Sequence, residues 1–418
     1  MSQAETAHSE HADQSKRVRD FYDQYPYPRP IDNLEAYKHR WQDIERRQAE
    51  FHLLWPDRTY REDFTILIAG CGTSQAAKHA LRWPRANVVG IDCSGTSVAY
   101  TEQLKKTYNL ENLHVRQLAL ERVSGLNMTF DQIVCTGVLH HLPDPNEGLR
   151  ALRSVLKPDG AMHLMVYAPY GRAGIYMMQE FSRRVGIHPG ERQIRDFISA
   201  LQLMPKGHPL QSLLSQAPDF RNEAELADAL LHPQDRAYSV SQLFDWIESA
   251  GLQFGRWIRQ APYSVNCGVI ARLPQVSQIA NLPVEEQYAS IELFRGTMVN
   301  HSCIVYDRDS QKTPVSFDGD KWLNYVPVRM PDTLCIQDRV PAGCAAVLIN
   351  CAHRYTDLLL PISSLEKKIY AAVDSQRTIK DIMQSINPSV DYLKIARTFF
   401  DRLWSYDQVV FNTTQRCD

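Results

Sequence analysis

Short apolar runs alternate with amphipathic segments between residues 64 and 168, and this alternation is the dominant pattern of the chain. Runs of strand length occupy residues 65–69, 87–91, 113–117, 130–135 and 161–167. Helical periodicity separates them at residues 74–81, 96–108 and 146–156. Strands that alternate with helices predict a parallel sheet with helices on both faces. Because the repeat stops after the fifth strand, the pattern favours an open, doubly wound α/β sheet over a closed barrel.

Two contrasting stretches precede the first strand. Residues 1–18 are polar and poor in aromatic side chains, which predicts disorder. Residues 21–30 combine four aromatic rings with three prolines. These prolines predict an extended strap, because they fix φ and exclude a helix; the strap either packs on the domain surface or closes over a ligand. Residues 33–54 then predict an amphipathic helix, with a buried face made of Leu34, Tyr37, Trp41, Ile44, Phe51 and Leu54.

Residues 170–240 interrupt the alternation and form a predicted helical insertion. Its helices are expected at residues 175–185, 192–203 and 210–216. A polar stretch, residues 228–240, precedes another helix at 241–250, which Ser239 or Ser241 would cap. The other polar side chains of this stretch either form ion pairs or face a ligand; they are His232, Asp235, Arg236 and Tyr238.

Residues 311–418 form a predicted third region. Strand-like pieces are expected at 314–317, 322–328, 345–350 and 408–411, and helices at 364–372, 378–386 and 391–403. Three helices and a closing strand predict a small α+β, winged-helix-like domain. Its segment 369–382, which contains Asp374 and Arg377, also resembles peptide-recognition domains of ribosomal-peptide pathways. Packing or dimerisation, peptide or protein binding, and nucleic-acid binding all stay open for this region.

Composition narrows the class of protein. The chain has 418 residues, 44% of them hydrophobic, which is enough for two or three domains with real cores. A net charge of -2 argues against broad electrostatic binding to nucleic acid or to an anionic membrane. No apolar run nears the roughly 20 residues that span a bilayer, and the polar first residues do not resemble a secretory signal. Nine scattered cysteines without a CxxC pair predict reduced thiols, a cytoplasmic location and no metal site.

A glycine-rich turn after the first predicted strand carries the first candidate chemistry. It reads Ala69-Gly70-Cys71-Gly72-Thr73, and glycines without a Cβ let the backbone approach a ligand closely. The second strand leads to Asp92, where a carboxylate can accept hydrogen bonds from both ribose hydroxyls. The turn and the carboxylate therefore predict an adenosine-type ligand at the carboxyl ends of the strands. Ser74 is the expected N-cap of the helix that follows.

Two further pieces give this region a family resemblance. They read Gly137-Val138-Leu139-His140-His141-Leu142-Pro143-Asp144-Pro145 and Leu156-Lys157-Pro158-Asp159-Gly160. Together with the glycine turn and Ile91-Asp92, they resemble the motif series of class I S-adenosylmethionine-dependent methyltransferases over residues 64–168. The resemblance implies S-adenosyl-L-methionine as the cofactor and a Rossmann-like sheet of seven strands. The last two strands would form an antiparallel hairpin, for which 252–258 and 266–272 are the candidates.

The resemblance also implies where the cofactor binds. The implied cofactor-binding residues are Tyr22, Gly70, Cys71, Gly72, Thr73, Asp92, Cys93, Leu118, Thr136 and Gly137. Three positions depart from the family pattern. Ile68 replaces the usual acidic residue of the first motif, Ser74 replaces its third glycine, and Leu118 stands near the usual acidic contact to the adenine amine. Without that first carboxylate, the cofactor amino group needs another acceptor, such as the Ala69 carbonyl or a hydroxyl of the strap.

The predicted activity is methyl transfer to an N or O acceptor, on a small molecule or on a peptide or protein side chain. The candidate catalytic residues are His141, His232, Asp235 and Tyr27. Two other classes stay open. One is a non-catalytic protein that keeps the cofactor fold and assembles a partner through its C-terminal region. The other is a nicotinamide oxidoreductase, which the motifs after the fourth strand disfavour.

The predicted domains follow from these assignments. Residues 1–60 hold the tail, the strap and a helix, and residues 61–310 form the methyltransferase domain, with the substrate-covering insertion at about 170–240. Residues 311–418 form the C-terminal domain, through which a homodimer is one arrangement.

Overall fold

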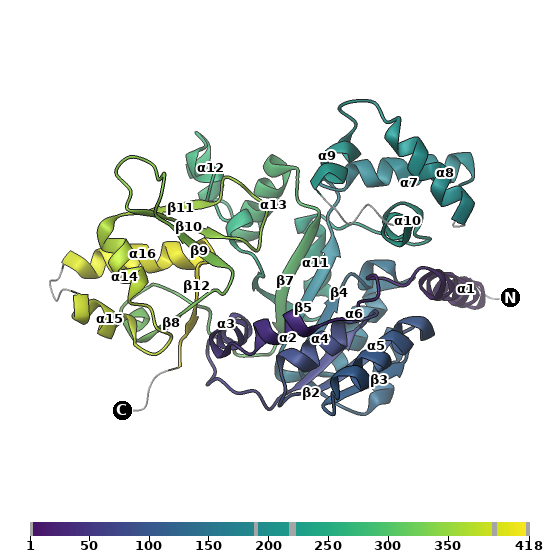
Figure 1. Cartoon of the computed structure of the whole chain (residues 1–418), viewed down its shortest axis with the longest axis horizontal. Helices are drawn as coiled ribbons and strands as arrows, with labels where there is room; N and C mark the ends of the chain where they lie inside the picture. The colour runs from purple at the N-terminus through teal and green to yellow at the C-terminus, as the bar shows by residue number, and fades with distance from the viewer. Residues whose placement is uncertain (1–2, 188–190, 217–222, 387–390, 415–418) are drawn as a thin grey trace. The chain divides into compact units, whose positions relative to one another are not determined.

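The computed structural model describes residues 3–187, 191–216, 223–386 and 391–414 (Figure 1). The chain divides into two compact units. The first unit contains residues 1–38, 63–254 and 292–308, and the second contains 39–62, 255–291 and 309–418. The second unit therefore draws on three separate segments of the chain. The sequence predicts domain boundaries near residues 61 and 311. The second unit instead groups residues 39–62 and 255–291 with the C-terminal segment 309–418.

One seven-stranded sheet organises the first unit, in the order β3-β2-β1-β4-β5-β7-β6. Its strands are β1 Thr65–Ala69, β2 Asn87–Asp92, β3 Leu113–Gln117, β4 Phe130–Thr136, β5 Leu156–Tyr167, β6 Leu252–Trp257 and β7 Asn300–Asp307. Strands β1 to β5 pair in parallel, whereas β7 runs antiparallel to β5. The carboxyl ends of the parallel strands therefore meet at one edge. This sheet confirms the predicted doubly wound, Rossmann-like fold class.

The predicted last strand was wrong. Residues 266–272 form turns and a short 3-10 helix, Ile270–Arg272, and the strand beside β5 is instead β7. Gly268 has a positive φ of +59°, a turn conformation rather than an extended one. A short apolar run does not reveal by pattern alone whether it forms a strand.

Helices flank this sheet close to where the pattern predicts them. They are α4 Gln75–Arg82, α5 Gly95–Tyr108, α6 Pro145–Ser154 and α11 Val240–Ser249. The start of α11 is explained by a capping box, in which Ser239 and Gln242 satisfy each other's backbone amides. Ser74 occupies the N-cap position of α4, but its hydroxyl makes no capping hydrogen bond. Helix α6 ends at Ser154, because the Leu156–Gly160 piece belongs to β5 rather than to a turn.

The N-terminal stretch is a helix, α1 Gln3–Gln24, which contradicts both the predicted disorder and the fully extended strap. Tertiary contacts explain the difference, because the end of α1 is anchored by buried rings and by a carboxylate. Phe21 and Tyr25 pack into a core of the insertion, and Asp23 accepts hydrogen bonds from Ser94 and Thr96 at the start of α5. Only the residues after α1 are free of regular structure, up to Leu34.

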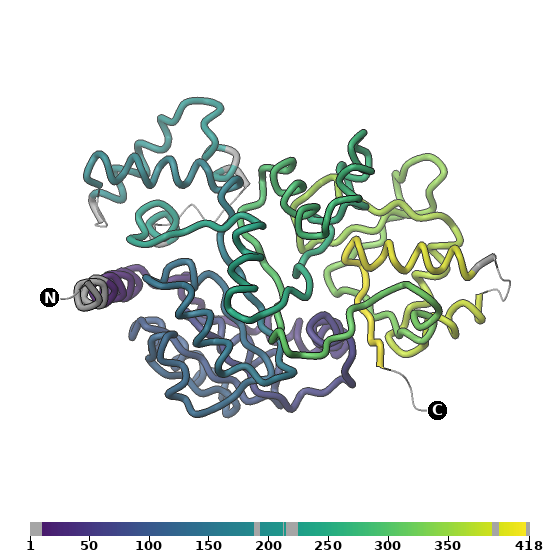
Figure 2. Tube along the Cα trace, turned by 180° about the vertical axis from the view of Figure 1, so that it is seen from behind, coloured from purple at the N-terminus to yellow at the C-terminus, as the bar shows by residue number. Residues whose placement is uncertain are grey.

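The insertion contains four helices, α7 Ala173–Val185, α8 Glu191–Gln202, α9 Pro209–Gln216 and α10 Glu223–Leu231. The first three agree with the predicted ranges, whereas α10 was not predicted because its residues were assigned to the polar stretch. Figures 1 and 2 show these helices as a group of their own within the first unit. Their core includes Ile175, Phe197, Leu210 and Leu230, and it receives Phe21 from α1.

The second unit combines two small sheets with helices. The sheets have the orders β11-β10-β9 and β12-β8. The elements of the unit are α3 Ile44–Leu54, β8 Val326–Arg329, β9 Thr333–Ile336, β10 Ala346–Asn350, β11 Leu359–Ile362, α12 Val276–Ala280, α14 Ser364–Ala371, α15 Ile379–Ile386, α16 Asp391–Ser405 and β12 Val409–Asn412. The three predicted helices and the closing strand are present, whereas residues 314–317 are not a strand.

The predicted helix over residues 33–54 is two helices. Helix α2 Glu35–Trp41 ends before Asp43, whose carboxylate caps α3 by accepting from the Glu45 amide. Of the predicted buried face, Leu34, Phe51 and Leu54 are buried. Ile44 is 52% exposed, because the new helix start turns it outward. Within the described residues, no helix combines the length and the apolar character needed to cross a membrane.

Candidate methyltransferase site

The glycine turn joins β1 to α4 at the carboxyl edge of the sheet. Gly70 and Gly72 have φ of +76° and +52°, which only glycine adopts without strain. A Cβ at Gly72 would lie 2.8 Å from the Tyr27 carbonyl oxygen, so the strap passes directly over this turn. The hydroxyl of Thr73 donates to the Pro28 carbonyl at 2.7 Å and holds the strap there. The predicted strap therefore lies on the predicted ligand-binding turn.

Asp92 ends β2 and organises the same edge. Its two carboxylate oxygens accept from the backbone amides of Gly72 at 2.8 Å and of Ser94 at 2.9 Å. Burial raises the pKa of this carboxyl, and the two amides oppose that effect. Each carboxylate oxygen has a second lone pair, so the group can also accept from ribose hydroxyls. The position expected for ribose recognition is thus also the residue that ties the glycine turn to β2.

The remaining expected cofactor contacts follow the ends of neighbouring strands. The Leu118 amide donates to the Asp92 carbonyl at 2.9 Å, just after β3. Thr136 and Gly137 end β4, and Gly137 has a φ of +76°. Burial raises the pKa of the Cys93 thiol to about 12, which makes it a protonated group rather than a nucleophile. The pKa of Cys71 is raised for the same reason.

A second group of side chains lies around the ends of β4, β5, α1 and α10. We call it the acceptor cluster, and it consists of Tyr22, His140, His141, Tyr167, Arg172, Asp228, His232 and Asp235. Three rings connect its members: the centroid of His141 lies 4.2 Å from that of His140 and 3.9 Å from that of His232. All three histidines are buried. Burial lowers the pKa of His140 and His232 well below the ordinary value, which leaves them neutral at neutral pH.

Hydrogen bonds to the main chain of Gln234 assign different tautomers to His141 and His232. His141 Nδ1 lies 2.6 Å from the Gln234 carbonyl oxygen. A carbonyl only accepts, so Nδ1 carries a proton, and whenever the ring is neutral Nε2 keeps its lone pair. His232 Nδ1 instead accepts from the Gln234 amide at 3.1 Å, which places the proton of its neutral ring on Nε2. His141 can therefore act as a base through Nε2, whereas His232 Nε2 is a donor.

Two carboxylates complete the acceptor cluster. Asp228 accepts a hydrogen bond from the Tyr22 hydroxyl at 3.1 Å, and burial raises the pKa of its carboxyl. Asp235 Oδ2 accepts from Arg172 at 3.2 Å and from Gln179 at 3.0 Å. The Arg172 guanidinium also lies 3.5 Å from the centre of the Tyr167 ring. This ion pair and ring contact fix the side of the acceptor cluster that faces α7.

The structure thus brings together three of the four predicted catalytic residues: His141, His232 and Asp235. Tyr27 lies on the strap and is 40% exposed, but it is near enough to Tyr167 of the cluster to raise the pKa of that phenol. Two other polar residues of the 228–240 stretch have structural contacts instead. Arg236 donates to the Pro143 carbonyl, and the Tyr238 ring stacks on Trp246.

Sequence reasoning missed Asp228, Arg172 and Tyr167. Asp228 opens the polar stretch and Tyr167 ends the fifth strand, so position alone could have marked both. The position of Arg172 in the sequence did not mark it, because its partner Asp235 lies far along the chain and contacts it only after folding.

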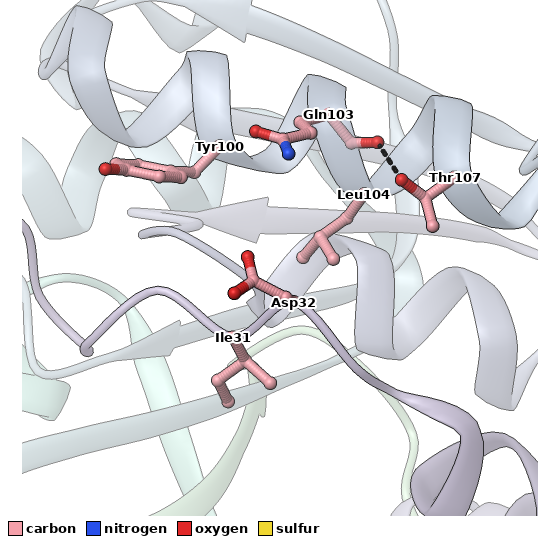
Figure 3. A pocket seen from close by; sticks show the side chains of 6 residues that line it. All are labelled: Ile31, Asp32, Tyr100, Gln103, Leu104 and Thr107. Atoms are coloured by element: carbon pink, nitrogen blue, oxygen red, sulfur yellow. Dashed lines mark hydrogen bonds between the residues drawn. The ribbon is translucent and has the colours of Figure 1, made fainter.

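A separate hollow lies elsewhere in the first unit. Figure 3 shows it between the residues that follow the strap and one side of α5. Its lining residues are Ile31, Asp32, Tyr100, Gln103, Leu104 and Thr107. None of them belongs to the glycine turn or to the acceptor cluster.

Comparison with known proteins agrees with this geometry. Residues 67–162 match the family model described as a methyltransferase domain. These residues cover β2 to β4 and most of β1 and β5, including the glycine turn, Asp92 and His141. Residues 67–162 thus form a methyltransferase domain of the class I, S-adenosylmethionine-dependent type. This confirms the resemblance found in the sequence motifs.

Several relatives share this methyltransferase region. An uncharacterized protein of Synechococcus, syc1184_c, is 37% identical over 199 residues, which are 45% of this chain and 47% of that protein. The ubiquinone biosynthesis O-methyltransferase of Pseudomonas fluorescens is 31% identical over 140 residues, 31% of this chain and 59% of that enzyme. The trans-aconitate 2-methyltransferase of Deinococcus radiodurans is 29% identical over 154 residues, 35% of this chain and 56% of that enzyme. The chain thus spans about half of each relative that it matches.

One solved structure resembles most of the chain. PKMT2 from Rickettsia typhi has a TM-score of 0.63 at 13% identity, and the match covers 90% of this chain and 77% of that one. At this identity the likeness concerns the fold. It extends the agreement beyond the methyltransferase sheet, because the sheet alone is a much smaller share of the chain.

Proposed function

We propose that this chain binds S-adenosyl-L-methionine along the carboxyl edge of its sheet and transfers the methyl group to a nitrogen or oxygen acceptor. The acceptor is a small molecule or a peptide or protein side chain. The observation that carries the proposal is the hydrogen bond between His141 Nδ1 and the Gln234 carbonyl, which leaves the Nε2 lone pair of the neutral ring available in the buried acceptor cluster next to the methyltransferase motifs. The match of residues 67–162 to the methyltransferase domain supports the cofactor.

The residues of the edge fit this cofactor. Gly70 and Gly72 leave room beside the backbone where a Cβ would clash, and Asp92 has lone pairs for the ribose. Helix α1 also links the two sites, because the Tyr22 hydroxyl donates to Asp228 while its neighbour Asp23 accepts from the Ser94 hydroxyl beside Asp92. The amino group that usually meets a carboxylate at position 68 would use the Ala69 carbonyl or a strap hydroxyl.

The bound sulfonium supplies an activated methyl group, and the chain supplies position and a base. In-line displacement depends mainly on holding the acceptor atom close to the methyl carbon. His141 Nε2 would take the proton of the acceptor, so that its lone pair is free to attack. The half-buried rings of Tyr22 and Tyr167 would help to exclude water from this position.

Calorimetry and labelling test the two halves of the proposal separately. The full chain should bind S-adenosylmethionine with a micromolar or lower Kd, and Asp92→Ala should abolish that binding. With methyl-labelled cofactor and an extract of the source cells, the chain should produce a labelled product. His141→Gln should keep cofactor binding and lower the labelling rate by roughly 100-fold, within the range for removal of a general base.

Two results would contradict the proposal. Failure to bind S-adenosylmethionine would show that the chain is not a methyltransferase. Tight binding without any labelled product, from small molecules or from protein, would favour a non-catalytic protein that assembles a partner.

A further inference from the structure

The acceptor cluster contains more buried carboxylates than permanent cations. Asp228 is 5% exposed, and the Asp235 side chain is 2% exposed. Among the eight residues of the cluster, Arg172 is the permanent cation, and its guanidinium pairs with Asp235 at 3.2 Å. Asp228 accepts a hydrogen bond from the neutral hydroxyl of Tyr22 at 3.1 Å. It forms no ion pair among the described residues. The Asp228 carboxylate therefore has no cation in direct contact among the described residues, although His141 and Arg172 act on it through space to lower its pKa.

The neighbouring histidines do not supply a second permanent charge. His140 and His232 are buried, and desolvation keeps them neutral near pH 7. An ionised carboxylate buried without a cation costs several kcal/mol in proteins. Asp228 therefore either takes up a proton in the free protein or is paired with a cation that a ligand brings.

We propose, resting on the proposed function, that the methyl acceptor is an amine that arrives as an ammonium ion and pairs with Asp228. The ammonium gives one proton to His141 Nε2, which becomes an imidazolium. The amine lone pair then forms the new C–N bond as the carbon–sulfur bond of the cofactor breaks, and the sulfur keeps that electron pair as a thioether. The methylated product leaves as an ammonium ion, and His141 returns its proton to water.

A metal ion is the main rival for this position. The ligand-capable atoms of His141, Asp228 and His232 all lie within 4.8 Å of one another. However, the Gln234 amide donates to His232 Nδ1, which leaves a proton on Nε2. A protonated ring nitrogen has no lone pair for a metal. At Asp228 the geometry therefore favours an organic cation, because the Asp228 carboxylate and His141 Nε2 are two acceptors, enough for an ammonium ion, whereas the third metal ligand is missing.

The product chemistry of the wild-type chain tests the proposal without any variant. The full chain is incubated with methyl-tritiated S-adenosylmethionine and an extract of the source cells. The labelled methyl groups should resist mild base and be retained on a cation exchanger after acid hydrolysis, as methylamines are. Ultrafiltration then distinguishes the two sources of an amine: label in the filtrate indicates a small metabolite, and label in the retained fraction indicates lysine side chains or amino termini.

Asp228→Asn provides the matched variant, since it keeps the shape of the side chain and removes its charge. Labelling should fall by about 100-fold or more, because the ammonium ion would lose the buried charge with which it pairs. The Kd for S-adenosylmethionine should stay within about twofold of the wild-type value, and Asp196→Asn, on the exposed side of α8, should change neither quantity.

Three outcomes would overturn the inference. Label released by base as methanol, or recovered in neutral ethers, would identify an oxygen acceptor. Loss of cofactor affinity in Asp228→Asn would show that the carboxylate pairs with the sulfonium, and loss of wild-type activity in a chelator would identify a metal. If the wild-type chain neither binds cofactor nor labels any product, the proposed function itself fails, and the inference with it.

Discussion

The hydroxyl of Tyr22, in the last turn of α1, donates to the carboxylate of Asp228, in α10, at 3.1 Å. The two residues belong to segments that are far apart in the sequence and that enclose the acceptor cluster together. The rings of Phe21 and Tyr22 also lie 5.1 Å and 5.3 Å from the ring of His232. The N-terminal helix therefore lines the candidate site, although its sequence predicts disorder up to residue 18 and an extended strap from residue 21.

Tyr22→Phe should lower both the stability of the protein and the rate of methyl transfer. The variant leaves the buried Asp228 carboxylate without its hydroxyl donor, which costs about 1–3 kcal/mol in the free energy of unfolding. Methyl transfer should fall about tenfold, as expected for a loss of roughly 1.4 kcal/mol in the transition state. Urea unfolding and labelling rates measure the two effects. Tyr170→Phe is the control, because Tyr170 is 42% exposed, and an equal effect of both variants would contradict the role given to Tyr22.

Gly72→Ala should disturb the contact between strap and glycine turn. Its Cβ would lie 2.8 Å from the Tyr27 carbonyl oxygen and 2.9 Å from Pro28 Cδ, and the φ of +52° disfavours alanine. We expect at least a tenfold loss of S-adenosylmethionine affinity, measured by calorimetry. Gly125→Ala is a matched control, because no atom lies within 4 Å of its added Cβ. Equal affinities for both variants would show that the strap does not influence the cofactor position.

The parallel part of the sheet could be predicted because its signals are local. Apolar runs bounded by glycine or by polar residues place β1 and β2 within one residue of their observed ends. The last position of the sheet was wrongly given to residues 266–272 instead of 300–307, because pairing with β5 is decided only in the folded chain. Helix α1 was not predicted for a related reason: its buried rings stabilise it by packing against the rest of the first unit.

The candidate site divides in the same way. His141 and Asp92 stand in contiguous motifs, so their positions at the carboxyl edge followed from the order of strands and turns. Asp228 and Arg172 come from helices that no motif marks, and their partners are Tyr22 and Asp235. Contacts between distant segments decide the charge balance of the site, and that balance is not encoded in any short stretch.

The stability of the second unit should fall as the pH falls from about 6.5 to about 4. Burial lowers the pKa of His52 from 6.5 to about 4, so the unfolded chain binds a proton in this window and the folded chain does not. The neutral ring thus contributes stability that is complete above pH 6.5 and is lost on acidification, on the order of 2–3 kcal/mol. His52→Phe should flatten this dependence in urea unfolding between pH 7.5 and 4.5. An unchanged slope, equal to that of the exposed-site control His114→Phe, would contradict the assignment.

Truncation after residue 309 tests whether the C-terminal region is separable. The second unit groups residues 39–62 with 309–418, and the Thr413 amide donates to the Pro56 carbonyl at 2.7 Å. Helix α3 and the residue after it bury Phe51 and Trp55, which are each 1% exposed. Removing the C-terminal segment takes away β8 and β12, which contact α3, and each uncovered large side chain costs roughly 1.5–3 kcal/mol. The truncated chain should therefore aggregate and bind a hydrophobic dye, which gel filtration and fluorescence would detect. A monomeric product that binds no dye and keeps full cofactor affinity would instead support an independent domain at residues 311–418.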